Sequence, residues 1–192
     1  MVQEASLDLT DRPSLMASLP KGGVAAEIGV AQGCFSGLIL ELCNPRTLYL
    51  IDPWEEQSAE VYSPNDPANF VQATHDGNLR QVREKFGADP QVTILRAYSV
   101  AAAEIFEDET FDWWHLDGNH REAAKDLKAW WPKLKHGGWG TGHDYTMIGD
   151  GSITVKRDVD EFVVEHGLKL FVTRGDTDVY EKNYPTWAIR KP

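Results

Sequence analysis

The chain has 192 residues, of which 42% are hydrophobic and 26% are charged, a composition typical of one soluble globular domain. Its formal net charge of −11 excludes a general affinity for nucleic acid, because a phosphate backbone would be repelled, and it favours a small-molecule substrate. The sequence has no apolar run long enough for a bilayer and no leader pattern, so we expect a cytoplasmic protein with no membrane partner.

The hydrophobic pattern predicts strands that alternate with helices along most of the chain. The predicted strands are residues 24–29, 47–52, 92–97, 111–118, 138–145, 168–173 and 186–191. Because helices separate most of these strands, we expect a parallel sheet with helices on both faces. The last two strands lack an intervening helix and can only be antiparallel neighbours. The pattern therefore predicts a doubly wound, Rossmann-like α/β fold with a seven-stranded sheet and a C-terminal antiparallel hairpin.

Apolar spacing also locates the helices, two of which matter for the site. One has Ala124, Leu127, Trp131 and Leu134 on a single face and is ended by the glycines at 137 and 138. The other covers about residues 79–86 and follows a polar stretch with two prolines, residues 57–78. A long loop in a compact domain is often functional, so residues 54–86 are predicted to be a lid, with a plain surface insertion as the alternative.

We expect residues 1–192 to form a single domain with an N-terminal extension at residues 1–20. The extension would be either a helix that covers the site or the arm of a homodimer, and composition does not decide between them. Cys34 and Cys43 lie on one predicted helix, so no disulfide framework is expected.

A tight glycine turn follows the first predicted strand. Gly29 and Gly33 allow positive φ angles and a close approach of the backbone to a ligand. Free N–H groups at the start of the next helix favour a negative group nearby. Asp52 ends the neighbouring strand and can accept hydrogen bonds from both hydroxyls of a ribose. With Glu27 in register, this spacing predicts a nucleoside-containing cofactor.

Nicotinamide-dependent oxidoreductases use the same device and are the first alternative. Their fingerprint has a middle glycine beside the pyrophosphate, whereas Ala31 occupies that position here, which suits a ligand without a pyrophosphate. Such an enzyme would need a Tyr-x-x-x-Lys motif, and Tyr98, Tyr145 and Tyr180 have no lysine four residues later. The second alternative is a non-catalytic cofactor-binding module, against which the acids and histidines at the strand ends argue.

The stretches AEIGVAQGCFS and LYLIDPW resemble motifs I and II of the class I S-adenosylmethionine-dependent methyltransferases, and the similarity covers about residues 20–191. The resemblance implies that Glu27 and the Gly29–Gly33 turn hold the methionine part and that Asp52 binds the ribose. It also implies that Ser99 lies at the adenine, with Tyr98 or Trp54 as its ring neighbour. The implied cofactor-binding residues are Glu27, Gly29, Gly33, Ser36, Asp52, Trp54, Tyr98, Ser99 and Asp117.

Acids and histidines follow the fourth and fifth predicted strands, in LDGNH and GHDY. These stretches resemble the macrocin, catechol and caffeoyl-CoA type O-methyltransferases, which bind a divalent metal at this place. The resemblance implies Asp117, His143 and Asp144 as ligands of Mg²⁺ or another divalent metal. His143 stands where an acid is usual, and imidazole suits Mn²⁺, Fe²⁺ or Zn²⁺ better than Mg²⁺.

Two readings without a metal remain open. Either His120 or His143 is a general base, since imidazole titrates near neutrality, with Asp117 orienting the acceptor. Alternatively, Asp117 caps the following helix and Asp144 bonds to a loop. The expected activity is methyl transfer to a small-molecule acceptor, with a hydroxyl group favoured.

Overall fold

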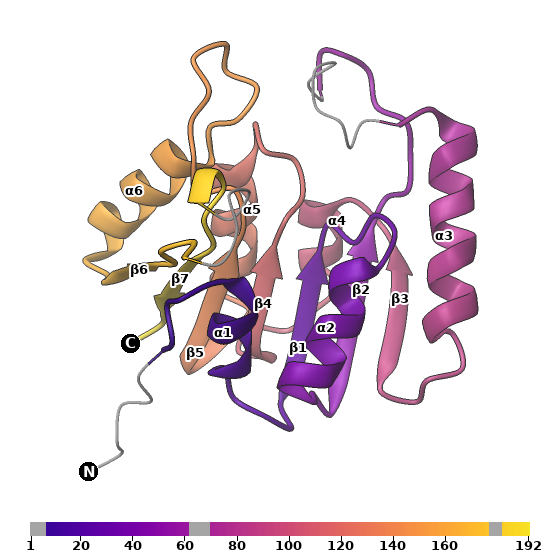
Figure 1. The fold of residues 1–192 in the computed structure, drawn as a ribbon, viewed down its shortest axis with the longest axis horizontal. Coiled ribbons are helices and arrows are strands. Elements are labelled where there is room, and N and C mark those ends of the chain that lie inside the picture. Colours follow the sequence, from indigo (N-terminus) through magenta and orange to yellow (C-terminus); the bar gives the residue numbers. More distant parts are fainter. Residues whose placement is uncertain (1–6, 62–69, 177–181) are drawn as a thin grey trace.

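The computed structural model describes residues 7–61, 70–176 and 182–192. In this part of the chain one sheet has the strand order β3-β2-β1-β4-β5-β7-β6 (Figure 1). The strands are β1 (Val24–Ile28), β2 (Thr47–Asp52), β3 (Val92–Arg96), β4 (Phe111–Leu116), β5 (Leu134–Gly142), β6 (Leu170–Val172) and β7 (Trp187–Arg190). β1 to β5 pair in parallel, and β7 lies antiparallel between β5 and β6. The predicted fold class is confirmed, including the C-terminal antiparallel hairpin.

Helices cover both faces of the sheet, because alternate residues of each strand point to opposite sides. The helices are α1 (Arg12–Ala17), α2 (Cys34–Cys43), α3 (Gln72–Phe86), α4 (Ser99–Ala103), α5 (Ala123–Trp130) and α6 (Val155–His166). Ala25 of β1 belongs to a core cluster shared with α1, α2 and α3, whereas Ala26 belongs to the cluster shared with α4, α5 and α6. Among the described residues, no helix combines the length and the apolar character needed to span a bilayer.

The helix before β5 differs from its prediction. It ends at Trp130, and residue 134 already begins β5. The buried face consists of Ala123, Asp126, Leu127 and Trp130, while Ala124 is exposed. Both faces fit a helical period and share Leu127, so spacing alone did not separate them. The correction matters because it places Asp126 on the buried side.

The predicted lid is also corrected in part. α3 begins at Gln72 rather than near residue 79, and Leu79, Val82 and Phe86 are buried in the core cluster on that face of the sheet. Residues 72–86 are therefore a regular helix that covers the sheet. The remainder of the predicted lid runs from residue 54 to 71, and its segment 62–69 lies outside the described residues.

Candidate active site

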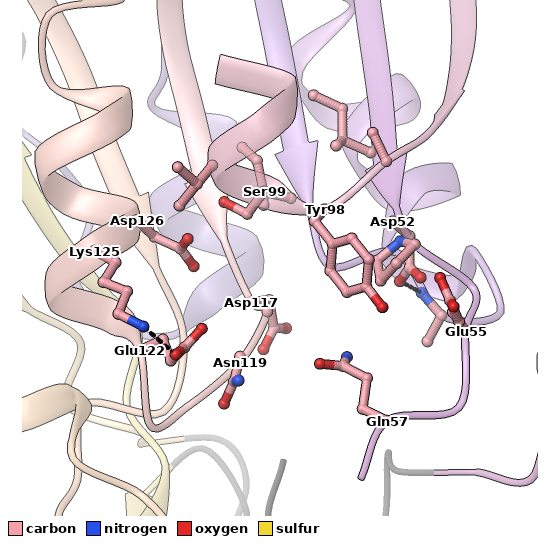
Figure 2. Close-up of a pocket in the computed structure, with 18 of the residues that line it drawn as sticks. Asp52, Glu55, Gln57, Tyr98, Ser99, Asp117, Asn119, Glu122, Lys125 and Asp126 are labelled. Carbon is pink, nitrogen blue, oxygen red and sulfur yellow. Dashed lines mark hydrogen bonds and ion pairs between the residues drawn. The ribbon is translucent and has the colours of Figure 1, made fainter. Parts of the chain in front are cut away.

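A cavity of about 440 Å³ lies at the carboxyl ends of β1, β2, β3 and β4 (Figure 2). The strand order reverses between β1 and β4, and open α/β sheets bind ligands at such a switch point. Of the nine predicted cofactor-binding residues, five line this cavity: Gly29, Asp52, Tyr98, Ser99 and Asp117. These residues follow four different strands, so the fold brings them together from distant parts of the sequence.

The glycine turn after β1 depends on the absence of side chains at two positions. Gly29 has a φ of 92°, and a Cβ there would lie 2.0 Å from the carbonyl oxygen of Asp117. Gly33 has a φ of 70° and precedes α2, and a Cβ there would lie 2.9 Å from the ring of Phe86. Only glycine allows both the backbone angle and the close approach at these positions.

Asp52 fixes this turn from the end of β2. Its Oδ2 accepts hydrogen bonds from the backbone N–H groups of Val30 and Ala31, both at 2.9 Å. Its Oδ1 accepts one from the N–H of Trp54 at 2.6 Å. Since a carboxylate offers about four acceptor positions, Oδ1 keeps capacity toward the cavity. Asp52 therefore positions the turn in addition to lining the site.

Trp54 does not line the cavity, contrary to the prediction of a ring neighbour for adenine. Its side chain is fully buried in the core cluster, and its Nε1 donates to the carbonyl oxygen of Ala31 at 2.9 Å. With no exposed surface, the indole cannot contact a ligand in this structure. Its large apolar ring is instead part of the packing beneath the glycine turn.

Glu27, Gly33 and Ser36 also do not line the cavity. Glu27 is 1% exposed, and its Oε2 accepts a 2.5 Å hydrogen bond from the hydroxyl of Ser36. Burial raises the pKa of Glu27 from 4.5 to about 8, against the opposing effect of the Ser36 hydrogen bond. The pair supports the turn from below rather than forming its surface.

Several cavity residues were not identified from the sequence. They are Glu55, Gln57, Phe70, Asn119, Glu122, Lys125 and Asp126. Glu55 and Gln57 come directly after the acid that ends β2, a position that the sequence does show. Asp126 could have been found as the acidic member of an otherwise apolar helix face, had the face been assigned correctly.

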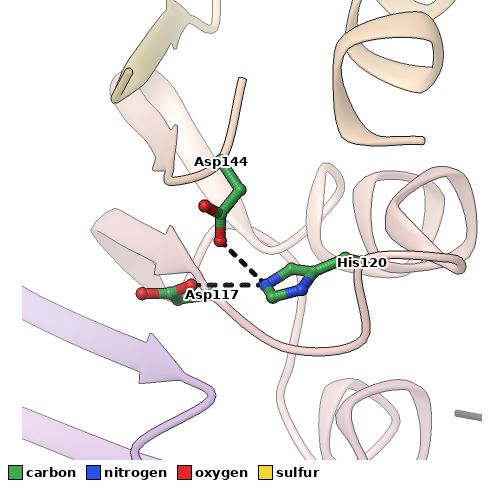
Figure 3. Close-up of side chains that lie close together, drawn as sticks. All are labelled: Asp117, His120 and Asp144. Carbon is green, nitrogen blue, oxygen red and sulfur yellow. Dashed lines mark ion pairs between the residues drawn. The ribbon is translucent and has the colours of Figure 1, made fainter. Parts of the chain in front are cut away.

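A second group of side chains lies where β4 and β5 end (Figure 3). The Nε2 atom of His120 lies 2.9 Å from Oδ2 of Asp144 and 3.7 Å from Oδ1 of Asp117. Burial disfavours ionisation of Asp144, but the hydrogen bonds from His120 and His143 outweigh it and lower the pKa. Burial also disfavours ionisation of Asp117, but the hydrogen bond from His120 and the nearby His143 outweigh it and lower the pKa of Asp117.

His143 lies beside the other two predicted metal ligands. It is 3% exposed, and its Nδ1 lies 3.3 Å from Asp144 and 4.0 Å from Asp117. One ligand atom each from Asp117, His120 and Asp144 lies within 4.8 Å of the others, and that set does not include His143. Among the described residues this candidate set contains His120, and the role of His143 as a metal ligand stays a prediction.

Asp144 is held in an unusual backbone conformation. Its φ is 52°, in the left-handed region that non-glycine residues rarely adopt. This conformation turns the carboxylate toward His120, which lies on the loop after β4 (Figure 3). Ala31 and Trp54 at the glycine turn also have positive φ values, 47° and 42°. Such conformations cluster at functional sites, where the surrounding structure enforces them.

The N-terminal helix α1 reaches this group. An Nη atom of Arg12 lies 3.7 Å from Oδ2 of Asp117, and its guanidinium lies over the ring of Phe35, 4.5 Å from the centroid. In the described part of residues 1–20, α1 lies beside this group, while the arm of a homodimer stays a prediction. Arg12 thereby adds a cation beside Asp117.

Fold and cavity together define the class: an α/β enzyme with the architecture of the class I methyltransferases. Residues 26–145 match the family described as a methyltransferase domain. Because this match spans more than half of the sequence, the chain belongs to that family. The prediction of an S-adenosylmethionine-dependent methyltransferase is confirmed. No curated protein matches the sequence.

Solved structures show the same fold at low sequence identity. The precorrin-6y C5,15-methyltransferase of Geobacter metallireducens has a TM-score of 0.63 and 18% identity, over 94% of this chain and 87% of that one. A Streptococcus mutans protein described as a methyltransferase, in complex with SAH, has a TM-score of 0.60 and 13% identity over 91% of each chain. An O-methyltransferase family protein of Burkholderia thailandensis has a TM-score of 0.59 and 14% identity, over 92% and 52%.

Proposed function

We propose that this protein transfers the methyl group of S-adenosylmethionine to a hydroxyl group of a small molecule. The observation that carries the proposal is the contact between His120 and Asp144 beside a cavity that Asp117 also lines. A hydroxyl is a weak nucleophile at neutral pH, so a base must remove its proton. The displacement at the methyl carbon also requires the acceptor oxygen to be aligned with the carbon–sulfur bond. An imidazole backed by a carboxylate is suited to that task.

In this proposal the cofactor occupies the cavity with its ribose at the end of β2. Asp52 and Glu55 supply acceptors for the hydroxyls, and the adenine extends toward Ser99. The methionine part lies at the Gly29 turn, close to Asp117, where the acids favour its cationic amino and sulfonium groups. This placement directs the methyl group toward the group formed by Asp117, His120 and Asp144.

His120 then removes the proton of the acceptor hydroxyl. Because Nε2 faces Asp144, it is Nδ1 of His120 that takes the proton as the hydroxyl oxygen attacks the methyl carbon, and the sulfonium leaves as a neutral thioether. Asp144 stabilises the imidazolium that forms, as an orienting carboxylate does in other base pairs of this kind. Asp117 and Arg12 line the approach and orient the acceptor.

The same three side chains fit a divalent cation. Two carboxylate oxygens and one imidazole nitrogen lie within 4.8 Å of one another, a mixed donor set that suits Mn²⁺, Fe²⁺ or Zn²⁺ better than Mg²⁺. Asp117, His120 and Asp144 would hold the ion, and a bound ion would lower the pKa of a coordinated hydroxyl. In that arrangement His120 acts as a ligand and is unavailable as a base.

The test is a transfer assay with methyl-labelled S-adenosylmethionine and matched panels of small phenols, sugars and amines. The proposal predicts label in hydroxylated acceptors, and no loss of that activity in a chelator if His120 is the base. Loss in the chelator and recovery with Mn²⁺ would assign the metal role instead. Label that enters only amines, in protein that binds the cofactor, would overturn the hydroxyl specificity.

A further inference from the structure

The first turn of α6 is joined to both loops that carry the proposed base and its carboxylate. Thr154 is the N-cap residue of this helix, and its backbone N–H donates to the carbonyl oxygen of His120 at 3.0 Å. Two residues later, the backbone N–H of Lys156 donates to the carbonyl oxygen of Thr146 at 3.0 Å. The first N–H groups of a helix have no partner inside the helix, so they can bind other segments. One helical turn thus ties the loop after β4 to the loop after β5.

The Thr154 hydroxyl anchors this turn to a buried acid. Its Oγ1 lies 2.9 Å from Oδ2 of Asp158 and 3.2 Å from the carbonyl oxygen of His120, and it has one hydrogen to donate. The shorter contact is to a carboxylate, the stronger acceptor, so the hydrogen belongs there. Arg157 donates to the other oxygen of Asp158, which is 4% exposed. The hydroxyl and the acid together fix the backbone whose N–H reaches His120.

The helix that carries this turn is held in place by the core. Val155 and Val159 are buried in the core cluster that α6 shares with α5, beside which it lies (Figure 1). On the β5 side, Tyr145 directly follows Asp144, and its hydroxyl donates to Asp160 of α6. Both loops are therefore anchored to one helix that is packed against the rest of the protein.

We propose that Thr154 and Asp158 are positioning residues, which set the contact between His120 and Asp144 through the first turn of α6. That contact joins two loops that follow different strands, with 2.9 Å between Nε2 and Oδ2 (Figure 3). The inference rests on the proposed function, in which this pair removes the proton of the acceptor or holds a divalent cation. Either role requires the two side chains to keep their relative position, because a small misplacement of catalytic groups lowers the rate steeply.

The first experiment measures methyl transfer to the acceptor found in the panel assay. Thr154→Val keeps the shape and the backbone N–H but removes the hydroxyl. It should lower kcat about tenfold while affinity for S-adenosylhomocysteine stays within about twofold. Thr154→Ser restores the hydroxyl and should recover most of kcat. Asp158→Asn weakens the acceptor of that hydroxyl and should lower kcat in the same direction by a smaller factor.

Thr110→Val is the matched control. The Thr110 hydroxyl also donates to a backbone carbonyl, that of Glu107, but Thr110 lies before β4, at the opposite end of the strand from the site. This variant loses one threonine hydroxyl and should keep the wild-type kcat. Thermal melts show that each variant is folded before its kinetics are compared.

A double-mutant cycle shows whether Thr154 acts through His120. In the His120→Gln background, Thr154→Val should lower kcat no further, since the residue that it positions is already gone. An equal loss in both backgrounds, or wild-type kcat in folded Thr154→Val, would overturn the positioning role. Wild-type kcat in His120→Gln alone would instead contradict the proposed function on which the inference rests.

Hydrogen exchange followed by mass spectrometry gives a readout that needs no acceptor. The segments around His120 and Thr146 should exchange faster in Thr154→Val than in wild type or Thr110→Val, because the turn that ties them is loosened. Equal exchange of these segments in all three proteins would overturn the proposal.

Discussion

At the β1–β2 end of the cavity the backbone supplies most of the contacts, whereas titratable side chains face one another in the group after β4 and β5. Asp52 accepts three backbone N–H groups there, and Gly29 brings the chain against the carbonyl of Asp117. Around Asp144 the partners are instead two histidines. The first region is therefore a cradle of backbone groups, the turn from Gly29 to Gly33 held by Asp52, while the second is a set of side chains that can exchange protons.

The largest expected effect comes from breaking the cradle at Gly29. Gly29→Ala would place a methyl group 2.0 Å from the carbonyl oxygen of Asp117 at a φ of 92°, so the turn must move. We expect a loss of at least about 3 kcal/mol in the free energy of unfolding, together with the loss of S-adenosylhomocysteine binding. Thermal melts and calorimetry measure the two effects.

Gly77→Ala is the matched control for this substitution. Gly77 lies within α3, and an added Cβ there meets nothing within 4 Å. The same chemical change should stabilise the helix by up to about 1 kcal/mol. If both variants behaved alike, the close approach at Gly29 would not be what constrains the turn.

Removing the base tests the group of side chains after β4 and β5. His120→Gln should lower kcat by about 10²–10⁴-fold, because the acceptor hydroxyl keeps its proton, while affinity for S-adenosylhomocysteine stays within about twofold. Steady-state kinetics on the acceptor found in the panel assay give the first value, and calorimetry gives the second. Unchanged kcat would remove His120 from the proposed mechanism.

Asp52→Asn should weaken both the glycine turn and cofactor binding. An amide would present one acceptor and one donor to three N–H groups, so at least one N–H loses its partner. We expect about 1–3 kcal/mol of lost stability and at least a tenfold loss in cofactor affinity. The melting curve and the titration report these separately, and wild-type affinity in this variant would contradict the role of Asp52.

A further expected effect depends on pH and concerns Glu27, the buried acid that bonds to Ser36. The pKa of Glu27 is raised by burial to about 8, so the unfolded chain ionises from about pH 4.5 while the folded protein keeps the proton. Its contribution to the stability of the folded state is therefore present below pH 4.5 and lost as the pH rises toward 8.

Glu27→Gln removes that dependence and keeps an acceptor for Ser36. Between about pH 5 and about pH 8 its unfolding free energy should rise relative to wild type by on the order of 2–4 kcal/mol. Denaturant melts at the two pH values measure the difference. Parallel pH dependence in the two proteins would mean that Glu27 is ionised when folded.

The sequence predicted the residues of the cradle better than the contacts among the acids and histidines after β4 and β5. Glycines with required φ angles and an acid at a strand end are local signals, so Gly29 and Asp52 could be assigned from spacing alone. The pairing of His120 with Asp144 joins loops after β4 and β5, and spacing does not say which of two histidines makes the contact. The resemblance implied His143 as a metal ligand, and the structure adds His120 as a second histidine close to both acids.

Tertiary packing accounts for the other differences between the predicted and the observed positions of side chains. Trp54 follows the ribose acid and was expected at the ligand, but a positive φ turns its ring into the core. Asp126 was overlooked because two overlapping helix faces both had apolar spacing, and only tertiary contact selects one of them. In both cases the predicted secondary structure was correct, but the side chain points in a different direction from the predicted one.

The most direct measurement is a calorimetric titration of the wild-type protein with S-adenosylhomocysteine and, separately, with NADH. The account predicts saturable binding of S-adenosylhomocysteine at one site and no binding of NADH, since the turn after β1 has no glycine at position 31 for a pyrophosphate. Binding of NADH without binding of S-adenosylhomocysteine, in protein that melts cooperatively, would contradict it.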